Sequence, residues 1–153
     1  MAEFIKPIIE TAIAILQART PALLRAAGLD EFVDFGQQFT GVAPNFPSVW
    51  VMPARTVFDA DSQHMRHQAH QLQIKFGVSG TEPDDVTAAA MGYMQAIDGA
   101  IGASDPEDWQ GVIQGGAVLR VFVQGHDYGA LFERGGAMAR FPELELIVET
   151  EEL

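Results

Sequence analysis

The sequence predicts an α+β domain, in which helices pack on one face of a small, mainly antiparallel β-sheet. Three observations lead to this fold class. The N-terminal residues repeat apolar side chains with helical spacing, HQLQIKFGV at 70–78 alternates apolar and polar side chains, and a helical pattern with acidic residues at its start follows from residue 81. Helices and strands that segregate in this way favour an α+β arrangement, and 1–153 is expected to form a single domain.

The N-terminus is expected to form a pair of helices. Apolar residues from Glu3 to Gln17 recur at i, i+3 and i+4, as in a helix with one buried face. The buried set is Ile5, Ile8, Ile9, Ala12, Ile13 and Leu16. Thr20 followed by Pro21 has the pattern of a new N-cap, and Gly28 is a typical C-terminal stop. A long helix and a short one, angled at Thr20-Pro21, are therefore predicted.

Residues 29–47 are expected to form an extended loop or arm. The segment begins acidic and continues as FGQQFTGVAPNFP, with two glycines and two prolines and no sustained helical period. Four phenylalanines punctuate it: Phe32, Phe35, Phe39 and Phe46. Two interpretations stay open: the aromatic rings pack on the core of their own chain, or the segment packs against a partner subunit.

Strands are expected on both sides of a polar run. SVWVMP at 48–53 is rich in β-branched and aromatic residues, whereas 54–69 is expected to be a second extended loop or arm. This loop contains most of the run QHMRHQAHQ. From His70, the residues Leu72, Ile74, Phe76 and Val78 alternate with polar ones, which predicts a half-buried strand.

The second half of the chain predicts a helix and two more strands. Thr81 with Asp84 resembles a capping box, and the apolar stripe that starts at Val86 ends at Gly102. AVLRVFVQ at 117–124 and LELIVE at 144–149 are predicted strands. HDYG at 126–129 and RGGA at 134–137 are typical turn sequences, so a turn is a better interpretation of His126-Asp127-Tyr128 than a catalytic dyad.

Composition and charge narrow the function classes. The 153 residues are 48% apolar and include no cysteine, so there is no disulfide, thiolate nucleophile or cysteine-bound metal. The formal net charge of −12 disfavours tight duplex binding, because such binding needs several Lys or Arg contacts to phosphates. No apolar run is long enough to cross a bilayer, and the N-terminus is a poor secretory signal, which fits cytosolic residence.

The histidine run does not predict a metal site. His64, His67 and His70 are three residues apart, so neither helix nor strand geometry brings the three rings together. Asp59 and Asp61 keep a metal site open as an alternative, but no HExxH spacing is present. We therefore predict no catalytic residue, no cofactor and no metal. If these histidines have a chemical role, partial protonation near pH 6 that tunes subunit assembly is a better hypothesis than metal binding.

The order of elements resembles a family of phage proteins. The resemblance lies in IKPIIETAIAILQ, PSVWVMPA, HQLQIKFGV, PDDVTAAAMGYMQAIDGAI, AVLRVFVQGHDYG and PELELIVE, and it spans nearly the whole chain. These segments are similar in order and spacing to the tail terminator and tail-completion (head–tail joining) proteins of long-tailed bacteriophages and prophages. The resemblance implies a non-enzymatic virion subunit of the tail or neck, assembled in the cytoplasm of a bacterial host.

The same resemblance implies the partners. The subunits would form a homo-oligomeric ring, expected to be a hexamer, that binds the tail tube protein and the head-side connector and involves no membrane. DNA would pass through the ring without specific binding, and acidic residues such as those in 143–152 would repel its phosphates. The candidate subunit contacts are Phe35, Phe39, Phe46, His64 and His67. A head–tail adaptor, stopper or minor tail protein is the alternative, and a metal-dependent enzyme that uses His64, His67 and His70 is the remote one.

Overall fold

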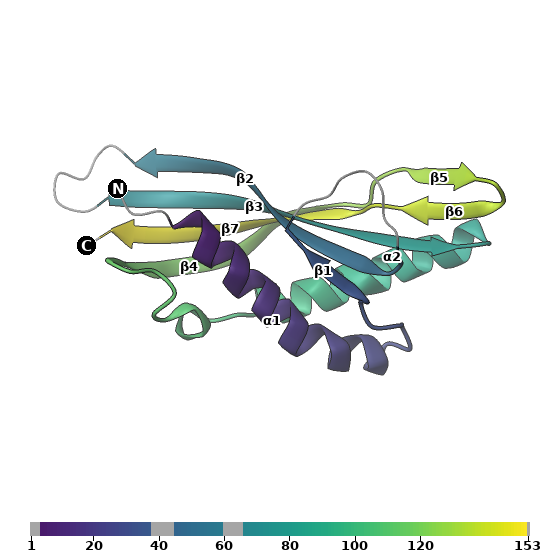
Figure 1. Cartoon of the computed structure of the whole chain (residues 1–153), viewed down its shortest axis with the longest axis horizontal. Helices are drawn as coiled ribbons and strands as arrows, with labels where there is room; N and C mark the ends of the chain where they lie inside the picture. Colours follow the sequence, from purple (N-terminus) through teal and green to yellow (C-terminus); the bar gives the residue numbers. More distant parts are fainter. Residues whose placement is uncertain (1–3, 38–44, 60–65, 153) are drawn as a thin grey trace.

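The protein is an α+β fold with one mixed, mostly antiparallel sheet, as expected (Figure 1). The structure, a computed structural model, describes residues 4–37, 45–59 and 66–152. Its larger elements are α1 (Ile5–Ala26), β1 (Asp34–Gly36), β2 (Ser48–Asp59), β3 (Arg66–Gly80), α2 (Pro83–Ile97), β4 (Gly116–Asp127), β5 (Leu131–Arg134), β6 (Ala137–Arg140) and β7 (Glu143–Glu152). A π-helical turn, η1 (Asp98–Gly102), and a 3-10 turn, η2 (Pro106–Trp109), connect α2 to β4.

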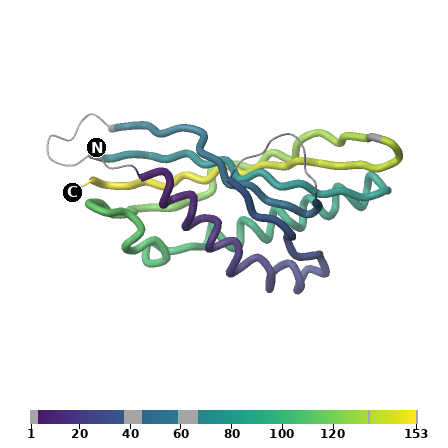
Figure 2. The backbone as a smooth tube through the Cα atoms, viewed as in Figure 1, coloured from purple at the N-terminus to yellow at the C-terminus, as the bar shows by residue number. Residues whose placement is uncertain are grey.

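The sheet is built around two long central strands. β3 lies between β2 and β7, β7 lies between β3 and β4, and all three of these pairings are antiparallel. The short β1 adds to β2 in parallel. At the other end of the molecule, the last residues of β3 pair with β6, which forms a hairpin with β5 (Figure 1). The start of α1 and the end of β7 lie at the same end of the elongated molecule (Figure 2).

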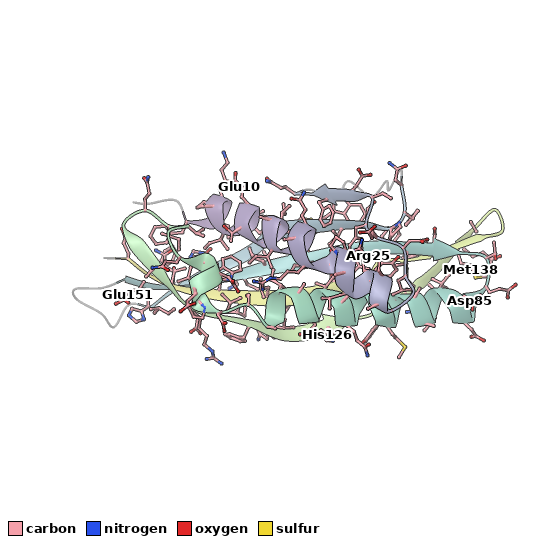
Figure 3. The ribbon with its side chains drawn as sticks, turned by 90° about the horizontal axis from the view of Figure 1, so that it is seen from below. Glu10, Arg25, Asp85, His126, Met138 and Glu151 are labelled. Carbon is pink, nitrogen blue, oxygen red and sulfur yellow. The ribbon has the colours of Figure 1, made fainter. Side chains whose placement is uncertain are left out.

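Both helices cover the same face of the sheet (Figure 3). The alternating residues of β3 that the sequence assigns to the buried side are buried: Leu72, Ile74, Phe76 and Val78. They lie beside inward residues of β2 and β7, with Val51 opposite Ile74 and Ile74 opposite Leu144. Because side chains alternate between the two faces of a strand, the intervening residues form an open face that points away from the helices.

One continuous helix replaces the expected N-terminal pair. α1 runs through Thr20 and Pro21, so Thr20 is not an N-cap. Instead, the Thr20 hydroxyl donates a hydrogen bond of 2.6 Å to the Leu16 carbonyl, inside the helix. Burial of Leu24 in the core keeps the residues after the proline in the helix, although proline removes one backbone donor. The predicted stop is confirmed: Gly28 has φ +74° directly after the helix.

The expected loop at 54–69 is wrong for most of its length. Residues 54–59 belong to β2 and residues 66–69 to β3, so the two strands form a long ribbon. A bulge between Pro53 and Arg55 interrupts the pairing, and the register continues from Arg55 opposite Gln71 to Asp59 opposite His67. Hydrogen bonds to the partner strand hold this polar sequence in an extended conformation. Such pairing depends on another segment of the chain, so the local sequence does not predict it.

Other element ends also differ from the sequence-based expectations. α2 begins at Pro83 with Glu82 as N-cap and no side-chain cap, so the capping box at Thr81 is wrong. Asp84 and Asp85 do occupy the first turn. The RGGA turn is confirmed: Gly135 and Gly136 have φ of +60° and +82° and join β5 to β6. The loop expected at 29–47 includes the short strand β1.

Candidate functional site: the open face and the margins of the sheet

The open face carries a column of glutamates on β7. Leu144, Leu146 and Val148 point into the core and are fully buried. The alternate positions therefore place Glu143, Glu145, Glu149 and Glu151 on the open face, and we call these four residues the acidic column. The strand expected at 144–149 is confirmed as part of β7, which pairs on both sides, with β3 and with β4.

Two basic side chains, those of Lys75 and Arg120, lie beside this column, and neutral polar side chains also contact it. Lys75 Nζ lies 4.0 Å from Glu143 Oε2, and the Gln73 amide donates a hydrogen bond to the same carboxylate. At the other end of the column, His67 Nε2 lies 3.9 Å from Glu151 Oε1. Arg120 of β4 is the register partner of Glu149, and its guanidinium lies 4.2 Å from the ring centroid of Phe122. The column is therefore a partly neutralised acidic strip at the centre of the sheet.

His70 is a core residue. Its side chain points to the helix side of β3 and is 2% exposed. Nδ1 lies 3.1 Å from the hydroxyl of Thr56 on β2, and Nε2 lies 3.1 Å from the hydroxyl of Thr150 on β7. Burial lowers the pKa of His70 to about 4, so the ring is neutral at pH 7. Its role is to join three strands by hydrogen bonds inside the core.

The histidine run does not converge on one point. His67 faces the open side of the sheet, while His70 faces the core from the same strand, as strand geometry predicts. His64 and Asp61 lie outside the described residues. Among the residues that the structure describes, no group of three His, Cys, Asp or Glu side chains is close enough to hold a metal ion.

A second histidine contact joins β4 to the end of α2. His126 Nε2 lies 2.7 Å from Asp98 Oδ2, at the first residue of η1. The pair borders a shallow hollow of about 440 Å³, next to the bulge between Val123 and Gly125. The HDYG turn expected at this place begins later, because His126 and Asp127 still belong to β4, and Asp127 accepts a hydrogen bond from the Gly129 N–H.

The described phenylalanines of 29–47 pack within their own chain. The ring centroids of Phe32 and Phe35 lie 5.9 Å apart at the edge of the core. Phe46 packs against Phe141 at 5.9 Å, on the open face above Gly77. Phe39 lies outside the described residues. A change of Phe46 to Asp is therefore expected to reduce the stability of the monomer, which makes it a poor probe of assembly.

The outer margins of the sheet carry exposed apolar side chains. β4 lies at one side and β2 at the other, beyond the part of β2 that the short β1 covers, and Val57 of β2 is 46% exposed while Leu119 of β4 is 42% exposed. The β5–β6 hairpin carries a third, Phe132, which is 57% exposed and packs against Phe141. The only signal in the sequence was the apolar composition of 117–124, which by itself predicts a strand but not its position at a margin.

The fold has a counterpart among solved structures. A chain described as "Virion of native gene transfer agent (GTA) particle" matches with a TM-score of 0.53 and 18% sequence identity, and the match covers 88% of this chain and 93% of that chain. At this identity the match shows a shared fold. No protein-family model matches the sequence, and no curated protein matches it. The helices in the described part of the chain include none long and apolar enough to cross a membrane.

Proposed function

We propose that this protein is a structural virion subunit of a tailed phage, prophage or phage-like particle. The observation that carries the proposal is the fold shared with a chain of a gene transfer agent virion, over nearly the full length of both chains. Within that class, we assign the protein to the ring-forming tail terminator or tail-completion subunits at the head–tail junction. Its partners would be copies of itself, the tail tube protein and the head-side connector.

The charge of the molecule supports this assignment. A ring that lets DNA pass must not hold its phosphates, and the chain has 21 acidic residues against 9 basic ones. The acidic column gathers four carboxylates on one strand, and β3 and β4 hold it at the middle of the sheet. A surface that includes this column would repel a duplex at close range, whereas the pair with Lys75 limits its effect on folding.

Electron microscopy and mass measurement test the assignment. The purified chain should form a ring, expected to be a hexamer, and the ring should bind to one end of assembled tail tubes. A chain that stays monomeric with and without tubes would contradict the proposal. Rings that bind capsid portals but do not bind tail tubes would instead assign the protein to the adaptors or stoppers, which are also structural proteins of the virion.

A further inference from the structure

The core becomes polar at the end of the sheet where α1 begins. Most side chains on the helix side of the sheet are apolar, but His70 and Thr150 are buried there, and Gln68 beside them is only 5% exposed. Among the described residues, Gln68 Nε2 is buried without a hydrogen-bond partner. An unpaired buried donor raises the energy of the closed structure. This end of the core is therefore polar and incompletely hydrogen-bonded.

The start of α1 covers this polar end through Phe4. The Phe4 side chain is 3% exposed, and its ring lies edge-on to the imidazole of His70, with 6.3 Å between the two centroids. A Cβ atom at Gly116 of β4 would come within 3.0 Å of the same ring, so Phe4 also reaches that strand. Water can therefore hydrate the imidazole only when the first turn of α1 or a neighbouring strand moves.

The first turn of α1 is the weakest part of that helix. Phe4 is the N-cap residue, and a phenyl ring offers no acceptor to the free N–H groups of the turn. Residues 5–8 include no acidic side chain to suit the positive end of the helix dipole, and Lys6 adds a positive charge there. The Ile8 N–H donates to the Phe4 carbonyl at 3.2 Å, the long end of the normal range. We expect this turn to open at a lower free-energy cost than the whole domain.

His70 has no charged partner in the described part of the chain. Its ring contacts Thr56 of β2, Thr150 of β7 and Phe4 of α1. Ionisable residues next to these contacts in the described segments lie on the open face or at the surface: Arg55, His67, Glu149, Glu151 and Lys6. Burial alone lowers the pKa of His70 to about 4. The closed core therefore offers no carboxylate to stabilise an imidazolium.

We propose that His70 and the first turn of α1 form an acid-sensitive switch, in which protonation of the imidazole opens this turn while the rest of the domain stays folded. A charged ring is stable in water and unstable in the closed core. One buried histidine cannot supply the free energy needed to unfold a domain, but it can open a weak turn that covers it. The switch belongs to the single chain and does not depend on the proposed virion role.

Proton linkage gives the direction and size of the response. The pKa of His70 is about 4 in the closed chain and 6.5 when the ring is in water, so between these values the opening of the turn takes up a proton. The equilibrium constant for opening should rise about tenfold for each pH unit below 6.5 and level off near pH 4, a total of roughly 300-fold. Above pH 7 the constant should not change with pH.

Hydrogen exchange followed by NMR tests the switch in the wild-type chain. After correction for the intrinsic exchange rate, the amides of Ile8 and Ile9 should lose protection about tenfold per pH unit between pH 6 and pH 4.5. Low concentrations of urea should not change their exchange, because a local opening exposes little surface. The amides of Ala90 and Met94 in α2 should stay better protected and should respond to urea, as expected for exchange through global unfolding.

Two histidine variants assign the response to one ring. His70→Gln removes the titrating group, so the protection of the Ile8 and Ile9 amides should no longer change with pH. His126→Gln is the matched control, because His126 lies at the surface of β4 beside Asp98, and it should keep the wild-type response.

Each other outcome would overturn the switch. Equal protection and equal urea dependence in α1 and α2 at every pH would show that the domain opens only as a whole, and this result needs no variant. Local exchange that does not change with pH, or a response that persists in His70→Gln, would show that the imidazole does not control the turn. Acid-induced exchange in residues 56–59 of β2, with α1 still protected, would assign the motion to the strand. Ring formation is measured separately and bears only on the proposed function.

Discussion

The imidazole of His70 lies 3.1 Å from the hydroxyl of Thr150, through Nε2, and this contact joins the two central strands β3 and β7 inside the core. The other nitrogen, Nδ1, contacts the hydroxyl of Thr56 at the same distance. A neutral ring can donate to one hydroxyl and accept from the other, whereas a protonated ring has no acceptor left. Because threonine hydroxyls can accept from either form, it is burial, which lowers the pKa of His70 to about 4, that favours the neutral ring.

We expect the free energy of unfolding to fall as the pH drops from about 6.5 to about 4, because of His70. Its pKa is about 4 in the folded chain and about 6.5 in the unfolded chain, so in this window only the unfolded chain binds the proton. The full effect is about 3 kcal/mol below pH 4, and it is absent above pH 7. Urea unfolding across this range measures it. His70→Gln should show a shallower pH dependence than wild type, and equal slopes would contradict the assignment.

Trp109 should anchor the segment between α2 and β4. Its side chain is 1% exposed, and Nε1 donates a hydrogen bond of 3.0 Å to the hydroxyl of Ser104. Trp109→Ala should cost about 3–5 kcal/mol, because it leaves a large cavity. Ser104→Ala should cost about 1–3 kcal/mol, because it leaves the buried indole N–H unpaired. Chemical denaturation measures both, and the exposed Gln110→Ala is the control, with a change within about 0.5 kcal/mol.

Pro21→Ala should stabilise the protein. Pro21 lies inside α1, where it offers no backbone N–H to the turn before it. Alanine restores that donor and should raise the free energy of unfolding by about 1–3 kcal/mol. Thermal unfolding gives the result, and Ala22→Gly, next to it in the helix, should shift stability in the opposite direction. A loss of stability in Pro21→Ala would show that the helix needs the proline ring at this place.

The purified chain should not retain duplex DNA. Its net charge is −12, and the acidic column places four carboxylates on one face of the sheet. A gel-shift titration at low salt should show no complex with the wild type. The double change Glu145→Lys and Glu149→Lys should increase retention. Salt-sensitive binding by the wild type would contradict the role that we propose for the column.

Much of the fold follows from local patterns. The alternation in 70–78 identifies the inward residues of β3, such as Ile74 and Phe76, and the helical stripe after Pro83 identifies the buried side of α2. Gly28 and the Gly135-Gly136 pair mark a helix end and a turn, because positive φ angles favour glycine. These features depend on one residue and its near neighbours, so the sequence displays them directly.

The tertiary structure decided the rest. Residues 54–59 and 66–69 look like a polar loop until pairing with each other and with β7 makes them strands. His70 looks like part of a polar run until Thr56 and Thr150 approach it from other strands. The sequence by itself determined which residues of the regular elements become buried and how much negative charge the chain carries. Which glutamates share one face, and which strands lie at the margins of the sheet, depends on contacts between residues far apart in the chain, and these contacts leave no local pattern.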